Sequence, residues 1–559
     1  MSESWLLKNF DLLATAPGGV ARLRELILTL AVQGKLIPQD PNDEPASELL
    51  KKIRVEKDRL IVDGKIKRDK PLAEIAEKEK PFELPVNWAW ERFGVIAGIE
   101  RGGSPRPIQS FLTNEPDSLN WIKIGDTEKG GKYITSTSEK IRRDGLSKTR
   151  MVFPGDFLLT NSMSFGRPYI TQIEGCIHDG WLRISPPSSL NKDFLYVLLS
   201  SRFIRTVFEA SAAGGVVLNL NADKVRTVPI PLPPLAEQSR IVARVEELMK
   251  LCDALEQNGR LADEQHARLT TSLFDALVTS ESAQALAENW QRVAESFDLL
   301  LDRPGAVDAL EQTVLQLAVR GMLVPQDEAE PSAKLFLRSM KIQKRSVDSS
   351  CDGFANAPYE TPGNWEWCKL ELIAQVGTGT TPSREVSEFF SPPEVPWVTS
   401  GETGNSHIRA TRQFVSNLAL TETSLKVYPV GTLIVAMYGQ GKTRGQVAEL
   451  LIPAATNQAC AAIVLHDKSE GHRDYVKLFF EKSYDEIRLQ AAGGAQPNLN
   501  VGKIKSTLIP VPPLNEQVRI VHCVKQLRVL CTQIRDQILN SRQTQSTLAG
   551  VLAEMATGT

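Results

Sequence analysis

Apolar residues recur at alternating steps of four and three along two long stretches of the chain, one from Ile241 and one from Ile520. This heptad spacing predicts helices with one apolar stripe, and each stretch begins soon after a Pro-Pro pair. A helix of about 36 residues is about 54 Å long at 1.5 Å per residue. We expect the spacer-helix core to consist of Ile241, Val245, Leu248, Leu255, Leu269 and Leu273 in the first stretch and of Ile520, Val524, Leu527, Ile534, Leu548 and Leu552 in the second.

One such stripe fits a helix lying on a globular core as well as it fits a helix paired with another helix. Because the chain carries two matched stripes, we favour pairing of the two long helices. His266 and Gln545 also fall at core positions. A polar residue there either fixes the register of a helix pair or is simply buried and hydrogen-bonded, and the sequence leaves both readings open.

Other patterns predict shorter elements. Apolar residues at three- and four-residue spacing predict helices over 20–30 and 307–317, and Gly and then Pro follow each of them, as expected beyond a helix end. The blocks at 81–234 and 358–513 contain short apolar runs separated by Gly and Pro, such as VFPGDFLLT and VYPVGTLIVAMY. These runs predict strands and turns with few helices.

The chain contains an internal duplication. Three separated blocks recur in the same order, which chance does not produce. The pairs are Phe10–Asp40 with Phe297–Asp327, Leu84–Trp90 with Thr361–Trp367, and Leu218–Val242 with Pro497–Val521. We therefore predict an α+β fold that is internally duplicated, with two strand-rich domains separated by paired long helices. The expected boundaries are helical region 1–80, strand-rich domain 81–234, long helix 235–280, helical region 281–357, strand-rich domain 358–513 and long helix 514–559.

The composition is ordinary for a soluble protein, with 42% hydrophobic and 24% charged residues. No apolar run approaches the roughly 18–20 residues that span a bilayer, and the N-terminus lacks the pattern of a secretion signal. The seven cysteines form no C-x-x-C pair, and the six histidines show no ligand spacing. We therefore expect a cytoplasmic protein with no membrane partner, no disulfide framework and no metal site.

The formal net charge of −2 neither demands nor excludes nucleic acid, because phosphate contacts need only local basic patches. Residues 81–234 carry 18 basic and 15 acidic side chains, whereas residues 358–513 carry 14 and 15. The two copies agree in their helical parts and diverge in the strand-rich blocks. This pattern suits a reader of two unlike DNA half-sites, since groove faces recur every 34–36 Å along DNA, but it suits a two-headed protein adaptor equally.

The sequences PIPLPPLAEQSRIV and PVPPLNEQVRIV, each closing a strand-rich block and opening a heptad helix, resemble the conserved regions of the specificity subunits of Type I restriction–modification enzymes. LAVQGKLIPQD and LAVRGMLVPQD are similar to helical segments of longer members, and NWAW and NWEW resemble the start of a target recognition domain. The resemblance covers nearly the whole chain, in the order of the family and twice over.

The resemblance implies that 81–234 and 358–513 are target recognition domains, each reading half of a split, asymmetric site in double-stranded DNA. It implies that the long helices form an antiparallel coiled coil that docks two methyltransferase (M) subunits, which restriction/motor (R) subunits join. It also implies that the chain itself is non-catalytic and holds no cofactor, while the partners use S-adenosylmethionine, ATP and magnesium.

Two pairs of loops carry side chains that hydrogen-bond base edges and phosphates. The first pair follows the first strand of each block and comprises Arg101, Ser104 and Arg106 in one copy and Thr380, Thr381, Ser383 and Arg384 in the other. The second pair comprises Asn161, Ser162, Ser164 and Arg167 in one copy and Tyr438, Gln440, Lys442, Thr443 and Arg444 in the other. We expect these loops to bind DNA, although solvated surface loops have the same composition.

The first block also holds a basic run containing Lys140, Arg142, Arg143, Lys148 and Arg150. Such a run is usually a solvated face, but in a domain that meets DNA it is a candidate for phosphate contact.

One motif favours a different class of function. Residues 436–443, AMYGQGKT, follow an apolar strand and satisfy a loose phosphate-loop pattern in which Lys442 and Thr443 would reach phosphates and magnesium. The helical pattern after this motif is weak, and the first copy has no such lysine. A nucleotide-binding enzyme is therefore an alternative, beside the protein-binding adaptor. No methyltransferase motif, paired carboxylates or nucleophile elbow stands out, so we expect no catalytic residues.

Overall fold

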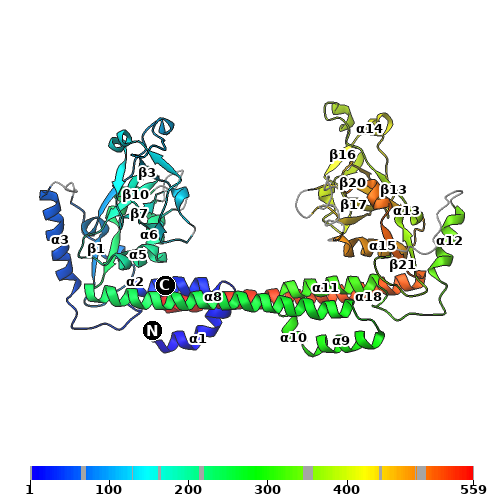
Figure 1. The fold of residues 1–559 in the computed structure, drawn as a ribbon, viewed down its shortest axis with the longest axis horizontal. Coiled ribbons are helices and arrows are strands. Elements are labelled where there is room, and N and C mark those ends of the chain that lie inside the picture. Colours follow the sequence, from blue (N-terminus) through cyan, green and yellow to red (C-terminus); the bar gives the residue numbers. More distant parts are fainter. Residues whose placement is uncertain are drawn as a thin grey trace. The chain divides into compact units, whose positions relative to one another are not determined.

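The computed structural model describes residues 3–63, 71–128, 130–161, 165–212, 220–343, 357–439, 443–484, 486 and 499–557. The chain divides into two units, one formed by Met1–Leu261 and Ser541–Thr559 and the other by Ala262–Asn540. Each unit combines one strand-rich head with a set of helices (Figure 1). The predicted duplicated α+β fold is confirmed.

The head of the first unit contains, within the described residues, a five-stranded sheet in the order β2-β10-β7-β8-β4, a four-stranded sheet β5-β3-β9-β6 and the pair β1-β11. All neighbours in the five-stranded sheet are antiparallel except β4 and β8. The strands are β1 Ala89–Arg92, β2 Gly98–Arg101, β3 Leu119–Ile122, β4 Tyr133–Ile134, β5 Glu139–Ile141, β6 Arg150–Val152, β7 Phe157–Thr160, β8 Pro168–Thr171, β9 Gly175–Ile177, β10 Trp181–Ser185 and β11 Pro229–Leu232.

The head of the second unit repeats this topology. Its described strands form a five-stranded sheet β13-β20-β17-β18-β15, a three-stranded sheet β16-β14-β19 and the pair β12-β21. The edge pair β15 and β18 is again parallel. The strands are β12 Glu366–Lys369, β13 Ala374–Thr378, β14 Val395–Val398, β15 His407–Ile408, β16 Gln413–Val415, β17 Leu433–Ala436, β18 Val447–Leu450, β19 Ala455–Thr456, β20 Cys460–Leu465 and β21 Leu508–Val511.

The shorter helices also correspond between the units. The first unit contains α1 Glu3–Thr15, α2 Gly19–Val32, α3 Ala46–Val62, α4 Phe93–Ile96, α5 Lys192–Ser200, α6 Arg202–Ala212 and α7 Ala222–Thr227. The second contains α9 Ala283–Glu295, α10 Phe297–Leu300, α11 Pro304–Val319, α12 Ala333–Gln343, α13 Leu370–Ile373, α14 Asn417–Glu422, α15 Glu470–Lys482 and α17 Val501–Lys505. Helices α2 and α11 are the two predicted from three- and four-residue spacing. No described helix has both the length and the apolar character needed to cross a bilayer.

Two helices of 44 residues each, α8 Leu235–Val278 and α18 Leu514–Thr557, begin directly after the Pro-Pro pairs. Each is about 66 Å long at 1.5 Å per residue, which exceeds the length expected from the stripe alone. Helix α8 begins in the first unit and ends in the second, whereas α18 begins in the second and ends in the first. The two helices therefore run between the units in opposite directions.

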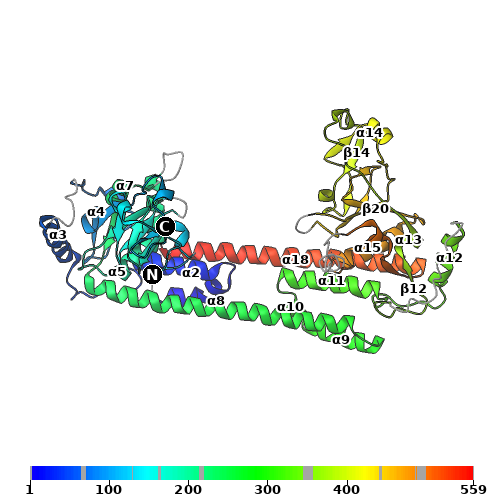
Figure 2. The same cartoon turned by 45° about the horizontal axis from the view of Figure 1, so that its top comes forward.

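In the first unit, a third helix takes part in the packing of the long helices. Helix α2 lies between α8 and the last turns of α18 (Figure 2). Arg24 of α2 forms an ion pair with Asp253 of α8 at 2.6 Å, and Arg22 donates a hydrogen bond to the Ser546 hydroxyl of α18 at 2.8 Å. The shared core contains Leu23, Leu26, Ile241, Val245 and Ala549.

The second unit uses α11 in the same way. Arg535 of α18 forms an ion pair with Asp308 of α11 at 2.7 Å, and Arg528 forms one with Glu311 at 3.1 Å. The shared core contains Phe274, Leu277, Val314, Ile520 and Val524. In both units the stripe of each long helix therefore packs on a short helix from the duplicated block.

Most of the predicted stripe belongs to these cores. Ile241, Val245, Ile520 and Val524 are buried, and partly buried positions pack against them at Leu248, Leu255, Leu273, Leu527, Ile534 and Leu552. Leu269 and Leu548 are different, since they are 45% and 48% exposed. The prediction that these two leucines are core residues is wrong.

The error has a geometric cause. Leu269 and Leu548 each lie four heptads beyond the start of their stripe, and a straight α-helix rotates about 20° per heptad away from a strict 3.5-residue repeat. After four heptads the buried face has moved by about 80°, close to one residue. The buried positions there are Thr270, Phe274 and Leu277 in α8 and Ala549 and Ala556 in α18, each one residue after the predicted stripe.

The two polar stripe residues do not fix a helix register. His266 Nε2 lies 3.0 Å from the carbonyl oxygen of Leu299 and 3.2 Å from the Asp302 carboxylate, so the imidazole contacts α10 and the segment that follows it. Gln545 is exposed.

Candidate nucleic-acid interface

In the first head, two loops meet the turn between β9 and β10, which contains His178, Asp179 and Gly180. One of these loops follows β2, and the other joins β7 to β8, so three loops lie together. Ser104 donates a hydrogen bond to the Asp179 carboxylate at 2.7 Å, and Asn161 Nδ2 donates to the Asp179 carbonyl oxygen at 2.7 Å. The Ser104 hydroxyl is the main reason that the pKa of the Asp179 carboxyl lies below its usual range. Asp179 is therefore ionised at neutral pH and holds the loops together.

Glycines allow the first loop of each head to lie directly on this turn. A Cβ atom at Gly102 would lie 2.2 Å from the carbonyl oxygen of His178, and one at Gly379 would lie 1.5 Å from that of Thr456. Any larger residue would push the loop away. The glycines in these loops are thus required by close backbone packing.

Basic side chains surround the cluster in the first head. Arg106 is 83% exposed, with a guanidinium nitrogen 3.7 Å from the Asp179 carboxylate. Arg101 donates to the Asp179 carbonyl oxygen at 3.3 Å, and Arg167 is exposed on the loop between β7 and β8. An exposed guanidinium held near a turn can reach phosphates or base edges of a bound duplex.

The predicted basic run lies beside the same loop. Strand β6 pairs with β9, and Gly103 packs against the backbone of Lys148. The arginines of the run are exposed, but each has an acidic partner: Arg142 with Asp144 at 3.3 Å, Arg143 with Asp117 at 2.8 Å and Arg150 with Glu100 at 3.7 Å. The Lys148 ammonium lies 5.6 Å from the centre of the Phe111 ring. Exposed pairs of this kind are weak, so they leave the arginines able to exchange partners for phosphate.

The second head has the same arrangement with different side chains. Its turn between β19 and β20 contains Asn457, Gln458 and Ala459. Thr381 donates a hydrogen bond to the side-chain oxygen of Gln458, and the backbone N–H of Met437 donates to the carbonyl oxygen of Ala459 at 2.8 Å. Gln458 therefore occupies the place that Asp179 has in the first head. An amide there offers both donors and acceptors, whereas a carboxylate only accepts.

These loops border a hollow of about 740 Å³ in the second head, lined in part by Thr378, Tyr438, Gln458 and Asn500. Tyr438 is 37% exposed. The neighbouring Arg444 is half-buried, and its Nε has no hydrogen-bond partner within the described residues. The hollow thus presents an aromatic ring and side-chain amides to any ligand at this surface.

The side chains predicted to contact DNA differ in how far they are exposed. Asn161 is 2% exposed and its Nδ2 donates a hydrogen bond inside the head, so it is not among the exposed side chains that could meet DNA. Three of the predicted residues, Ser104, Thr380 and Thr381, are half-buried and form hydrogen bonds with neighbouring side chains. Ser383 and Arg384 are exposed. Thr443, next to Arg444 in the chain, is half-buried. The predicted residues Ser162, Ser164, Gln440 and Lys442 lie outside the described residues.

Three residues of this candidate interface were missed by sequence reasoning: Asp179, Gln458 and Asn500. The first two lie in a turn between two apolar strands, where only pairing of the strands reveals which loops meet. Asn500 belongs to the repeated L-N-x-x-K block, and its counterpart Asn221 follows Leu220, whose N–H donates to the Asn161 carbonyl at 3.0 Å. The retention of this block in both copies was the available signal.

The phosphate-loop alternative fails on topology. A phosphate loop joins a strand to a helix N-terminus. Here β17 is followed by β18, which pairs with it antiparallel with Ile434 opposite Ala448, so the motif lies in a β-hairpin. Within the described residues there is also no group of three or more His, Cys, Asp or Glu residues that could hold a metal ion.

The family of this chain follows from comparisons of its sequence with those of known proteins. A family model described as the Type I restriction modification DNA specificity domain matches residues 85–263 and 362–541, so each match covers one head and continues into a long helix. The EcoEI specificity subunit of a Type I restriction enzyme from Escherichia coli is 31% identical over 586 residues, covering 96% of this chain and 94% of that protein. The EcoAI specificity subunit, also from Escherichia coli, is 31% identical over 581 residues with the same coverage. Among solved structures, the HsdS subunit from Thermoanaerobacter tengcongensis is 18% identical, and the alignment covers 86% of this chain and 98% of that one with a TM-score of 0.40.

Proposed function

Because this chain belongs to the family of Type I restriction–modification DNA specificity subunits, we propose that its heads read the two halves of a split, asymmetric DNA site through the loops gathered at Asp179 and Gln458. The chain is a DNA sequence-recognition subunit, and specificity subunits are non-catalytic components of their complexes. One observation carries the proposal: the same three loops meet in both heads on the same strand order, but with different side chains. A shared frame with divergent contacts is what two unlike half-sites require.

The side chains proposed to contact DNA are those that are exposed around each cluster, together with the half-buried Thr443 and Arg444. They are Arg101, Arg106, Arg142, Arg143, Lys148, Arg150 and Arg167 in the first head and Ser383, Arg384, Tyr438, Thr443 and Arg444 in the second. Arginine donates paired hydrogen bonds to guanine and to phosphate, which suits both sequence reading and positioning.

We further propose that the long helices set the spacing of the half-sites and dock two methyltransferase subunits, to which motor subunits bind. In this scheme the partners supply S-adenosylmethionine, ATP and magnesium chemistry, and the complex acts in the cytoplasm. The long helices expose large apolar side chains at Leu251, Leu261, Val529, Leu530 and Leu539, each between 49% and 57% exposed. Large apolar side chains that stay exposed on these helices are candidate contacts for a protein partner.

The test is a methylome. The chain is co-expressed with its partner methyltransferase in a host free of other DNA methylation, and modified adenines are mapped by sequencing. A split, asymmetric motif with one fixed gap supports the proposal and identifies both half-sites. Methylation without sequence preference, in a complex shown to assemble, would overturn it and favour the two-headed protein adaptor.

A further inference from the structure

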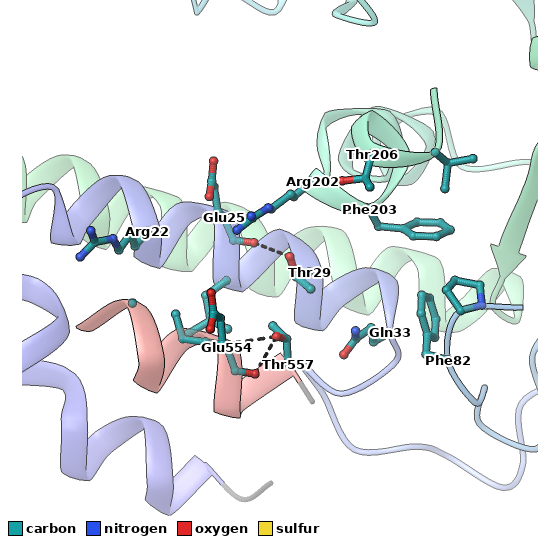
Figure 3. Close-up of a pocket in the computed structure, with 15 residues that line it drawn as sticks. Arg22, Glu25, Thr29, Gln33, Phe82, Arg202, Phe203, Thr206, Glu554 and Thr557 are labelled. Atoms are coloured by element: carbon teal, nitrogen blue, oxygen red, sulfur yellow. Dashed lines mark hydrogen bonds between the residues drawn. The ribbon is translucent and has the colours of Figure 1, made fainter. Parts of the chain in front are cut away.

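A groove of about 750 Å³ lies in the first unit (Figure 3). Its walls come from α2, α6, the last turns of α18 and the segment before β1. Phe82 and Phe203 form an apolar wall, with ring centres 5.3 Å apart at 75°. Glu25 and Glu554 line the groove from α2 and α18, and neither carboxylate forms an ion pair with a described residue.

One buried polar atom in this groove lacks a partner. Gln33, in the turn that ends α2, is 4% exposed, and no described residue donates a hydrogen bond to its Oε1. Figure 3 shows the Gln33 side chain beside Phe82. A buried amide oxygen without a donor is destabilising relative to one that accepts a hydrogen bond. The groove is therefore favourable to a ligand that brings a hydrogen-bond donor to this point.

The duplicated position in the second unit shows which donor fits. There Arg320 replaces Gln33, and Tyr359 replaces Phe82. The Arg320 guanidinium lies 4.7 Å from the centre of the Tyr359 ring and donates to the carbonyl oxygen of Val278, the last residue of α8, at 3.4 Å. The second unit thus fills the place with its own guanidinium on an aromatic face, next to the negative end of a helix dipole.

The first unit has an aromatic ring at the same place, Phe82, but Gln33 stands where the second unit has the guanidinium of Arg320. Lys35 donates to the carbonyl oxygen of Thr557, the last residue of α18, at 3.2 Å, but no described cation lies over the Phe82 ring. Arg202 extends from α6 toward Glu25 and away from Phe82 (Figure 3). What remains is an aromatic face, an unpartnered acceptor and the carboxylate of Glu554.

We propose that this groove binds an arginine side chain from a partner protein. The guanidinium lies over Phe82 and donates to Gln33 Oε1, while the apolar residues flanking the arginine cover Phe203 and Val207. The aromatic face and the carboxylate favour a cation, and the planar guanidinium fits a ring face better than an ammonium does. This inference goes beyond DNA reading, and it stands or falls independently of the proposed function.

The experiment measures binding of N-acetyl-arginine amide to the full-length chain by saturation-transfer NMR. N-acetyl-citrulline amide, which has the same shape without the charge, is expected to bind about tenfold more weakly. The peptide acetyl-Leu-Ala-Arg-Ala-Leu-amide is expected to bind about tenfold more tightly than the single residue, because it also buries apolar surface. Equal binding of the arginine and citrulline compounds would refute recognition of the guanidinium. Equal binding of the peptide and the single residue would refute the proposal that the arginine belongs to a protein segment.

Two variants locate the site. Gln33→Arg supplies the guanidinium within the chain, as Arg320 does, and is expected to abolish peptide binding and to raise Tm by about 2–4 °C. Arg205→Gln is the control. It changes an exposed arginine of α6 that lies outside the groove, and it is expected to change neither peptide binding nor Tm. Phe82→Leu, which keeps an apolar side chain without the ring, is expected to weaken binding about tenfold. Unchanged binding in both Gln33→Arg and Phe82→Leu would refute the groove as the site.

Discussion

The indole N–H of Trp88 donates a hydrogen bond to the carboxylate of Glu237 at 2.9 Å, and both side chains are buried. Trp88 belongs to the N-W-x-W motif that opens the first head, and Glu237 lies in the first turn of α8. Gln39 donates to the other carboxylate oxygen at 2.7 Å. The second unit repeats this bond between Trp365 and Glu516 at 3.0 Å. Three separated sequence blocks recur in the duplication because they meet at one carboxylate, which joins head, short helix and long helix.

Trp88→Phe is expected to lower the stability of the first unit by about 1–3 kcal/mol, because a buried carboxylate loses one of its two donors. Burial already raises the pKa of Glu237 against those hydrogen bonds, and loss of the indole raises it further. Hydrogen exchange of β1 and β11 measures the effect locally. Trp90→Phe is the control, since Trp90 packs against Phe82 and Phe203 through its ring. Equal protection in both variants would show that the Trp88 bond contributes nothing.

The pKa of Glu79 is shifted in the opposite direction to that of Glu237, and this shift makes stability depend on pH. Its carboxylate accepts two hydrogen bonds from Arg92, at 2.8 and 3.0 Å, and these chiefly lower its pKa from 4.5 to about 2. A lowered pKa in the folded state means that the contribution is complete above pH 4.5 and is lost as the pH falls from there toward 2. Acid titration of unfolding should therefore be flatter for Glu79→Gln than for the wild type over that range. Parallel curves would contradict the assignment.

Arg106→Ala and Arg167→Ala are each expected to weaken DNA binding and to reduce the slope of log affinity against log salt by about 1, if each side chain contacts a phosphate. Binding of the assembled complex to its site at several salt concentrations gives the slope. Arg59→Ala is the control. Arg59 is an exposed arginine of α3, and its removal should leave the slope unchanged. A loss of affinity at one base position with an unchanged slope would instead indicate a base contact.

Inserting seven residues into both α8, after Leu261, and α18, after Asn540, is expected to change the gap between the half-sites. One heptad adds about 10 Å of helix, which corresponds to about 3 base pairs of DNA at 3.4 Å each. Methylome sequencing reports the new gap directly. An unchanged gap in an active complex would mean that the helices do not set the spacing.

The rotation of the buried face gives a stability test within α8. Phe274→Ala should destabilise the second unit by about 3–5 kcal/mol, because it leaves a cavity in the core. Leu269→Ser, at the position favoured by the strict heptad, should change stability by less than about 0.5 kcal/mol. Denaturant unfolding with a probe in the second unit compares the two. A larger loss for Leu269→Ser would contradict the rotated stripe.

The sequence by itself determined the duplication, the α+β class, the start of both long helices and the loops that flank β2 and β13. These follow from local chemistry: Pro-Pro ends one element, spacing selects helix or strand, and repetition is visible in the letters. It did not show that Asp179 and Gln458 gather the loops, that Asn161 is buried, or that the stripe rotates away from Leu269. Those depend on which strands pair and on the accumulated twist of a straight helix, and both arise only when distant segments meet in three dimensions.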